Sequence, residues 1–242
     1  MRGTFVIDSL PEQGLRYRHD HDIVAVDVFR ATTTIVTALD RGRRVYPVVD
    51  EAEARELARR VPHAVLAGEL AGHRPDGFTF NNSPSTIASA VDQRPLILVS
   101  SAGTKLLANS RGAAAVYVAC FRNLSAVSSR LASAPRPIAL IGAGARGQPR
   151  PEDSMACARI GQFLMTKGFV AEDAGTADHV AEWAEVDFQT VRSGASAEFL
   201  RSTGQQEDID FVIEHVNDVD LVVLYDGTEA KADGPARQVV GS

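Results

Sequence analysis

Short apolar runs alternate along the chain with segments of helical periodicity. The runs are continuously apolar, which is typical of strands buried on both faces of a sheet. They cover residues 23–29, 44–49, 64–68, 96–100, 115–120, 138–143 and 221–226. Because such strands need helices over both faces, the pattern predicts an α/β fold with mostly parallel buried strands covered by helices on both faces.

The segments between these runs carry helix start and stop signals. Asp50 precedes a helical pattern at 51–60, and Glu53 is placed as its partner in a capping box. Further helices are predicted to begin after Ser83, with Pro84 in the first position, and at Pro151, and to end at Gly168 and, for a helix around 196–203, at Gly204. The tail after Gly227 is expected to be frayed.

Two segments of the chain share one order of elements. Residues 23–48 and 96–119 both run from a strand through a polar loop and a Thr-containing helix start to Arg-Gly and a second strand. Any two βαβ units look alike to this extent, but the order also fits two similar, closely packed halves whose strand ends face one cleft. Since no Gly/Ser-rich linker divides the chain, we treat residues 1–242 as a single catalytic unit.

Composition narrows the class of ligand. The chain has 31 acidic and 25 basic residues, and its Lys and Arg are scattered, which argues against a nucleic acid as partner. No apolar run is long enough for a signal peptide or a membrane helix, so we expect a cytoplasmic protein that acts on small molecules. The two cysteines, Cys120 and Cys157, are expected to be buried and unpaired. The sequence leaves a homo-oligomer open.

The loop after the first predicted strand carries the richest chemistry. Asp27 ends the strand, Arg30 follows one turn later, and Thr32, Thr33 and Thr34 open a helix. Amides at a helix start, hydroxyls and a guanidinium together bind phosphate or carboxylate groups well. A capped helix with an Asp27–Arg30 ion pair is the alternative.

A second loop of the same kind follows the strand at 96–100. It contains Ser100, Ser101, Gly103 and Thr104 before another helix start. Because ligands of open α/β sheets bind outside the carboxyl ends of strands, we expect both loops to lie at one edge of the sheet.

Oxygen ligands gather in two other loops. Glu69 leaves a strand, and Asn82 and Ser83 follow on a long loop, a set that suits Mg²⁺ unless the loop is simply solvated. Residues 142–147 have the Gly-x-Gly-x-x-Gly spacing, but Pro149 and Pro151 delay the helix, which argues against a dinucleotide site. This loop instead delivers Glu152 and Asp153 at a helix start, as metal ligands or as acids favoured by the helix dipole.

The assembled segments resemble the 2-phosphosulfolactate phosphatase family. The matching stretches are DVFRATTTIVTAL, GEL followed by DGFTFNNSP, SSAGT, FRNLSAV with Asn123, GAGARGQPRPEDSMACA, and SGASAEFLRSTG with Asp208. The resemblance implies a Mg²⁺-dependent phosphatase that converts a small sulfonated phosphate ester to 3-sulfolactate and phosphate, a step toward coenzyme M.

On this basis the candidate site residues take roles. Asp27 and Arg30 would be catalytic, and Mg²⁺ would be held by carboxylates from Asp27, Glu69, Glu152 and Asp153. Substrate and phosphate would be bound by Thr32, Thr33, Thr34, Asn82, Ser83, Ser100, Ser101, Gly103, Thr104 and Asn123. Whether Asp27 attacks phosphorus or holds metal and water is open, and Phe29 at the position where haloacid dehalogenases carry a second aspartate favours water.

Two positions depart from the family pattern. Ala102 stands where an asparagine is expected, and Leu70 stands where an arginine commonly follows the glutamate. Each change removes a polar group, so we expect a larger effect on sulfonate recognition than on the reaction class. A non-catalytic anion-binding or regulatory module on the same scaffold is the alternative function, although four carboxylates near an anion site favour a metal enzyme.

Overall fold

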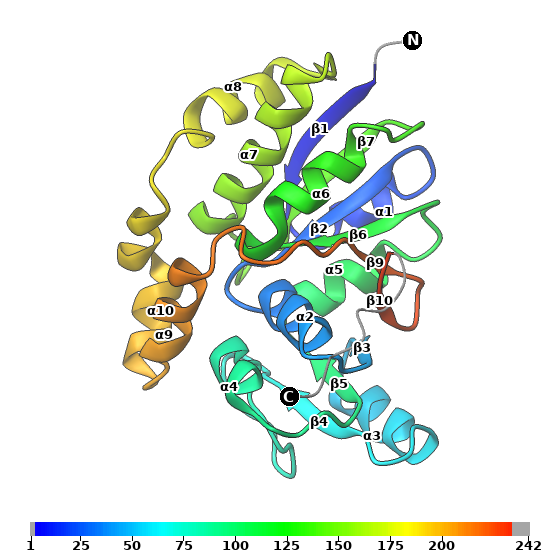
Figure 1. The fold of residues 1–242 in the computed structure, drawn as a ribbon, viewed down its shortest axis with the longest axis vertical. Helices are drawn as coiled ribbons and strands as arrows, with labels where there is room; N and C mark the ends of the chain where they lie inside the picture. Colours follow the sequence, from blue (N-terminus) through cyan, green and yellow to red (C-terminus); the bar gives the residue numbers. More distant parts are fainter. Residues whose placement is uncertain (1–2, 234–242) are drawn as a thin grey trace.

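The computed structural model describes residues 3–233 of the chain (Figure 1). The strands are β1 (Thr4–Ser9), β2 (Asp22–Val26), β3 (Val45–Val48), β4 (Val65–Gly68), β5 (Leu96–Val99), β6 (Val116–Ala119), β7 (Ile138–Gly142), β8 (Val170–Ala171), β9 (Val223–Tyr225) and β10 (Ala230–Ala232). The helices are α1 (Gln13–Tyr17), α2 (Ala31–Asp40), α3 (Glu51–Arg60), α4 (Pro84–Ser89), α5 (Gly103–Asn109), α6 (Leu124–Leu131), α7 (Pro151–Thr166), α8 (Ala174–Trp183), α9 (Ala195–Ser202) and α10 (Gln206–Glu214). Two short 3₁₀ helices cover Phe121–Asn123 and Phe188–Ser193.

The seven predicted strand runs are all confirmed, and the fold is α/β. In β2 every residue is buried: Val24 and Val26 enter one hydrophobic core, while Ile23 and Ala25 enter another. A strand that buries both pleat faces in this way explains the continuous apolar pattern.

The helix boundaries also follow the sequence signals, with one difference. The Asp50 carboxylate accepts the Glu53 N–H at 2.8 Å, but the Glu53 carboxylate accepts the N–H of Val49 rather than that of Asp50. Ser83 caps α4 through the N–H of Thr86, and α7 ends just before Gly168, whose φ is +87°. Asp50, Ser83 and Gly168 therefore mark the boundaries that local chemistry assigns to them.

The strands join in one mixed sheet whose order is β4-β5-β3-β10-β9-β6-β2-β7-β1-β8 within the described residues. The strands β4, β5 and β3 form one parallel group, and β6, β2, β7, β1 and β8 form the other. Between them lies the hairpin β9–β10, which pairs antiparallel with β6 on one side and with β3 on the other. The two parallel groups therefore run in opposite directions. In each group the same kind of strand stands in the same place: β5 and β2 are second from the outside of the eight strands from β4 to β7 in this order, and β3 and β6 lie next to the hairpin. This is the arrangement that two similar halves would give.

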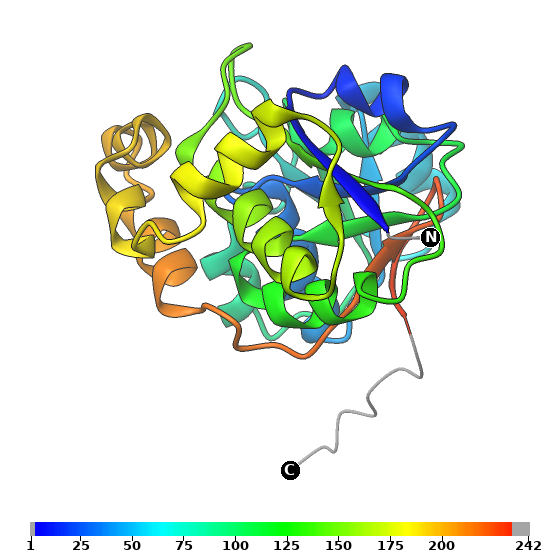
Figure 2. The same cartoon turned by 90° about the horizontal axis from the view of Figure 1, so that it is seen from above.

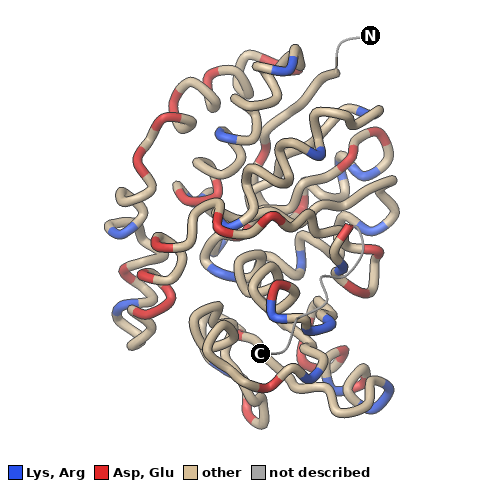
Figure 3. Tube along the Cα trace, viewed as in Figure 1, with Lys and Arg blue, Asp and Glu red and all other residues tan. Residues whose placement is uncertain are grey.

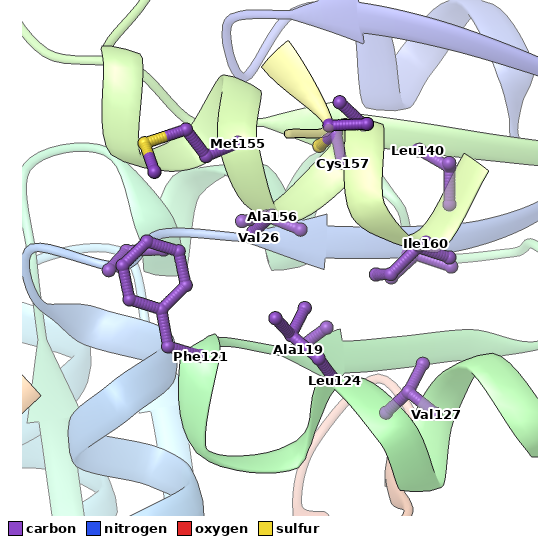
Figure 4. Packing of buried hydrophobic residues seen from close by; sticks show 14 of the residues in the cluster. Val26, Ala119, Phe121, Leu124, Val127, Leu140, Met155, Ala156, Cys157 and Ile160 are labelled. Carbon is purple, nitrogen blue, oxygen red and sulfur yellow. The ribbon is translucent and has the colours of Figure 1, made fainter. Parts of the chain in front are cut away.

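Both parallel groups face one shared core. The central helices α1, α2, α4 and α5 pack in it against residues of β2 and β5. On the outer faces, α3 covers β3 and β5, while α6 and α7 cover the group around β2 (Figure 4). Cys120 and Cys157 lie in the central and the outer core respectively, buried and free as expected.

Three features differ from the sequence expectations or extend them. β1 and the short edge strand β8 were not predicted, and β1 inserts beside β7 far from its neighbours in sequence. The tail is not frayed throughout, because β10 pairs with β9 and Glu229 pairs with Arg44 at 2.8 Å. The remaining tail residues, 234–242, lie outside the described part. No helix within residues 3–233 has the length and apolarity to cross a membrane.

The C-terminal helices complete the molecule. Figures 1 and 2 both place α9 and α10 on the side away from the N-terminus. α10 packs against α4, although more than a hundred residues separate them in sequence. This contact brings the C-terminal part of the chain to the loops that follow β2 and β4.

Candidate active site

An open cavity of about 210 Å³ lies where the loops after β2, β4, β5 and β7 meet the start of α9. Its charged lining residues are Asp27, Glu69, Arg30, Arg146 and Arg150. The lining brings two carboxylates together with three guanidinium groups.

The loops after β2 and β5 do meet, but not by sharing a sheet edge as the sequence argument assumed, since the two strand groups run in opposite directions. They meet because α2 and α5 start at one point in the shared core. A Cβ placed on Gly103 would lie 2.6 Å from the Cβ of Ala31 and 2.3 Å from Oδ2 of Asp27. Gly103 therefore acts by leaving room for the Asp27 carboxylate.

Asp27 is the buried acid of the cavity, with 6% of its surface exposed. Burial raises the pKa of its carboxyl to about 7, and the negative charge of Glu69 adds to the effect, while the N–H of Ala31 and the charge of Arg30 oppose it. A carboxyl with a pKa near neutrality can exchange protons at physiological pH or gain from a bound cation.

Arg30 precedes α2 and lines the cavity, but it does not pair with Asp27 as the alternative interpretation expected. Its Nη1 donates to Oδ2 of Asp208 at 2.6 Å and also to the side chain of Gln205. The guanidinium is therefore held by one residue of α10, Asp208, and by Gln205, which directly precedes this helix.

The three threonines of this loop do not line the cavity. The hydroxyl of Thr32 bonds the backbone of Asp27, and that of Thr33 donates to the carbonyl of Val28 at 2.8 Å. The Thr34 hydroxyl is buried without a partner. Their placement is that of a helix start that fixes Asp27, rather than of direct phosphate ligands.

In the serine-rich loop after β5, some hydroxyl groups bond the backbone and only part of the loop lines the cavity. Ser100 and Thr104 bond each other's backbone and are buried, whereas Ser101 lines the cavity. Ser101 binds the Glu69 carboxylate through its N–H at 2.8 Å and its hydroxyl at 3.1 Å, and the N–H of Gly72 donates to Glu69 as well. Glu69 thus ties the loop after β4 to the loop after β5.

Glu152 and Asp153 lie at the start of α7, beneath the cavity wall. Both oxygens of Asp153 accept backbone N–H groups, from Val28 and from Gly144, each at 2.9 Å. Burial, followed by the charges of Asp27 and Glu152, raises the pKa of Asp153 well above its usual range. Oε2 of Glu152 is buried without a partner, and burial raises the pKa of this group too.

The structure therefore does not gather the four predicted carboxylates into one ligand set. Asp27 and Glu69 line the cavity, whereas Glu152 and Asp153 do not. The two oxygens of Asp153 join the loops after β2 and β7, because one accepts from Val28 and the other from Gly144. Its placement is that of a structural tie.

The remaining predicted residues separate clearly. Asn82 lines the cavity, with its Oδ1 buried and unpartnered, and Ser83 lies just behind it, donating to Asp208 at 2.7 Å. Asn123 is fully buried away from the lining: its amide accepts the N–H of Cys120 and donates to the carbonyls of Val118 and Leu221.

Asn123→Ala is expected to destabilise the protein by about 2–4 kcal/mol, because an N–H and two carbonyls lose their buried partner. The melting temperature should fall, by roughly 5–10 °C, while the Kd of inorganic phosphate for the folded protein stays within about twofold of wild type. Thermal unfolding and calorimetry check this. A tenfold rise in this Kd at an unchanged melting temperature would restore a ligand-binding role.

Several residues of the cavity were not predicted. Arg146 and Arg150 come from the glycine-rich loop, and Ser196 and Phe199 come from α9. The Phe199 ring lies under the Arg146 guanidinium, 5.0 Å from ring centre to Cζ, and packs closely on Gly72. The two arginines in GARGQPR were a visible signal for an anion site.

Asp27 and Glu69 are the two carboxylates of the cavity that could hold a metal ion. Mg²⁺ is commonly held by one or two carboxylates together with waters and substrate phosphate oxygens. No group of three or more His, Cys, Asp and Glu in residues 3–233 is arranged to hold a metal ion. A divalent cation beside Asp27 would favour the charged form of its carboxyl, which burial and then the charge of Glu69 disfavour.

A buried carboxylate and three guanidinium groups around one cavity of an α/β sheet are typical of an enzyme that acts on a small anionic molecule. Comparison with known proteins gives the family. The sequence profile of the 2-phosphosulpholactate phosphatases matches residues 8–228, and the chain belongs to this family. It is accordingly an enzyme, a phosphoric monoester hydrolase.

Individual relatives agree with the profile over nearly the whole chain. The 2-phosphosulfolactate phosphatase of Methanothermobacter thermautotrophicus is 31% identical over 211 residues, which is 84% of this chain and 87% of that protein. The probable 2-phosphosulfolactate phosphatase of Clostridium perfringens is 30% identical over 216 residues, or 86% and 87% of the two chains. The matched region includes every element that lines the cavity.

Proposed function

We propose that the enzyme hydrolyses 2-phosphosulfolactate to 3-sulfolactate and phosphate, with Mg²⁺, as a cytoplasmic step of a coenzyme M-type pathway. The names of the relatives support this substrate. The observation that carries the proposal is the lining of the cavity, in which Arg30, Arg146 and Arg150 surround a space of about 210 Å³ beside the Asp27 carboxylate.

The charges of the cavity suit this substrate. A phosphorylated sulfonated hydroxy acid carries phosphate, sulfonate and carboxylate groups, and guanidinium groups bind such oxyanions through paired N–H donors. Arg30 is buried at the Asp27 end of the cavity, so we assign the phosphate to it, and Arg146 and Arg150 to the other anionic groups.

The reaction then follows from the positions of the chain's own groups. A water oxygen attacks phosphorus, the bond from phosphorus to the ester oxygen breaks, and a proton of that water ends on the leaving oxygen, which becomes the hydroxyl of the product. Asp27 orients this water, Arg30 neutralises charge on the phosphate, and Asn82 orients the substrate. Mg²⁺ would be held by Asp27 and Glu69, and when bound it would neutralise further charge on the phosphate.

The two departures from the family pattern bear on the sulfonate. Ala102 lines the cavity, where it replaces an expected amide with a methyl group. Leu70 lies beside Glu69 with its side chain partly exposed, and it offers no cation. We therefore expect discrimination between a sulfonated ester and its carboxylated analogue to be modest, roughly tenfold in kcat/KM.

A phosphate-release assay tests the proposal. The purified enzyme should release phosphate from 2-phosphosulfolactate with Mg²⁺, release it more slowly from the carboxylated analogue, and lose activity in EDTA. Activity that is unchanged in EDTA would contradict the metal requirement. No release from any ester at saturating Mg²⁺ would favour an anion-binding module instead.

A further inference from the structure

A buried ion pair joins the cavity to the C-terminal helices. Nη1 of Arg30 lies 2.6 Å from Oδ2 of Asp208, and the two side chains are 4% and 2% exposed. The partners are 178 positions apart in sequence and come from the loop before α2 and from α10. Asp208 therefore reaches Arg30 from behind the cavity wall, without lining the cavity itself.

The other oxygen of Asp208 is fully used as well. Oδ1 accepts the hydroxyl of Ser83 at 2.7 Å, the hydroxyl of Ser85 at 2.6 Å and the N–H of Ser85 at 3.1 Å. These donors belong to the first turn of α4, and the residue before Ser83 is Asn82, which lines the cavity. One carboxylate thus sets both Arg30 and the segment that carries Asn82.

The orientation of Arg30 is fixed by a second acceptor. Gln205, which precedes α10, also accepts from Nη1 of Arg30, and the same Gln205 oxygen accepts the side-chain amide of Asn81 at 2.8 Å. Both anchoring bonds use a single nitrogen of the guanidinium. The rest of the group stays available to an anion in the cavity.

Stability alone does not account for this arrangement. A buried ion pair stabilises a fold little compared with well-packed apolar side chains, because both charges lose their hydration. The pair does give a flexible arginine one orientation, and such preorganisation is what anion binding and phosphoryl transfer require.

We propose that Asp208 is a positioning residue for the phosphatase reaction, holding Arg30 and the start of α4 in the geometry that receives the phosphate. The inference rests on the proposed function, in which Arg30 contacts the phosphate. Loss of this support is expected to lower kcat/KM by roughly 10- to 100-fold, the usual scale for residues that orient a binding group.

The test compares Asp208→Asn with Asp210→Asn, a matched control on the same helix that breaks the surface pair with Arg192. Kinetics of phosphate release and the Kd of inorganic phosphate, from calorimetry, are measured for both. We expect Asp208→Asn to raise the Kd about tenfold, whereas Asp210→Asn stays near wild type. Where Asp208→Asn does not fold, Asp208→Glu keeps the charge, displaces it by one methylene and should show the same direction.

A purely structural tie between α4 and α10 is separated by a double-mutant cycle with Arg30→Lys. If Asp208 acts through Arg30, Asp208→Asn lowers kcat/KM by a much smaller factor in the Arg30→Lys background than in wild type. The inference would be overturned if Asp208→Asn lowered kcat/KM by the same factor in both backgrounds, or if it left the Kd of inorganic phosphate unchanged. If the wild type releases no phosphate from 2-phosphosulfolactate, the proposed substrate fails, while the Kd measurements still decide the role of Asp208.

Discussion

Asp27→Asn is expected to lower turnover at least about 100-fold while leaving the fold intact and making the metal-free protein more stable. The carboxylate is the buried acid of the cavity, and its loss removes the group to which we assign the orientation of the attacking water. The amide has nearly the same shape and fits the space beside Gly103. Retention of more than about a tenth of the activity would remove Asp27 from the mechanism.

The stability effect has a defined pH dependence. Because the pKa of Asp27 is raised to about 7 from about 3.9 in an unfolded chain, the folded state binds the extra proton between these values. Stability therefore falls as the pH rises from about 4 to 7, by a few kcal/mol at ~1.4 kcal/mol per pKa unit. Because asparagine does not titrate, Asp27→Asn should not show this loss of stability with rising pH.

Thermal unfolding in EDTA at pH 5 and pH 8 measures the difference. Asp27→Asn should unfold at a higher temperature than wild type at pH 8, and the difference between their melting temperatures should be smaller at pH 5. Added Mg²⁺ should raise the melting temperature of wild type more than that of Asp27→Asn. Asp22→Asn is the matched control, since Asp22 is buried at the opposite end of the same strand. It should keep its activity. A wild type that is more stable at pH 8 than at pH 5 would contradict the charge argument.

The strands and helix ends were predictable because their signals are local. The continuous apolar run of β2 reports its two buried faces, and Asp50 and Ser83 cap helices through bonds that span three residues. Asp27 could be found in the same way, as a polar residue directly after a buried strand. Neither observation depends on what lies far away in the sequence.

The partners of Arg30 could not be found by local reasoning. Spacing suggested an ion pair with Asp27, yet Arg30 pairs with Asp208, because α10 packs on α4 beside it. The roles of hydroxyl groups were also overstated: a threonine at a helix start satisfies the backbone first, as Thr32 does with Asp27. Only tertiary structure separates hydroxyls that reach the cavity, such as that of Ser101, from those that do not.

The acidic composition takes on a different meaning beside the cavity. The chain carries a net charge of −6, and acidic residues occur throughout the described fold (Figure 3). Such a surface repels an anionic substrate, so capture depends on local attraction by Arg30, Arg146 and Arg150. We therefore expect the arginines of the cavity, rather than the field of the whole protein, to govern KM.

Gly103→Ala is expected to lower kcat/KM about 100-fold although it adds only one methyl group. A Cβ at this position would lie 2.3 Å from Oδ2 of Asp27 and 2.6 Å from the Cβ of Ala31, both far inside contact distance. Neither neighbour can move freely, since both are buried where α2 and α5 start. The carboxylate must therefore shift away from the position in which, under the proposed mechanism, it orients water.

Gly175→Ala is the control for this substitution. Gly175 also lies in the first turn of a helix, α8, but its nearest neighbour to an added Cβ is an oxygen of Asp173 at 3.4 Å. This variant should keep full activity and be slightly more stable, because alanine favours the helix. Gly103→Ala should instead lose about 1–3 kcal/mol of stability through overpacking, measured by denaturant unfolding. If Gly103→Ala were as active as Gly175→Ala, the position of the Asp27 carboxylate would not limit the reaction, and the role assigned to Asp27 would fall with it.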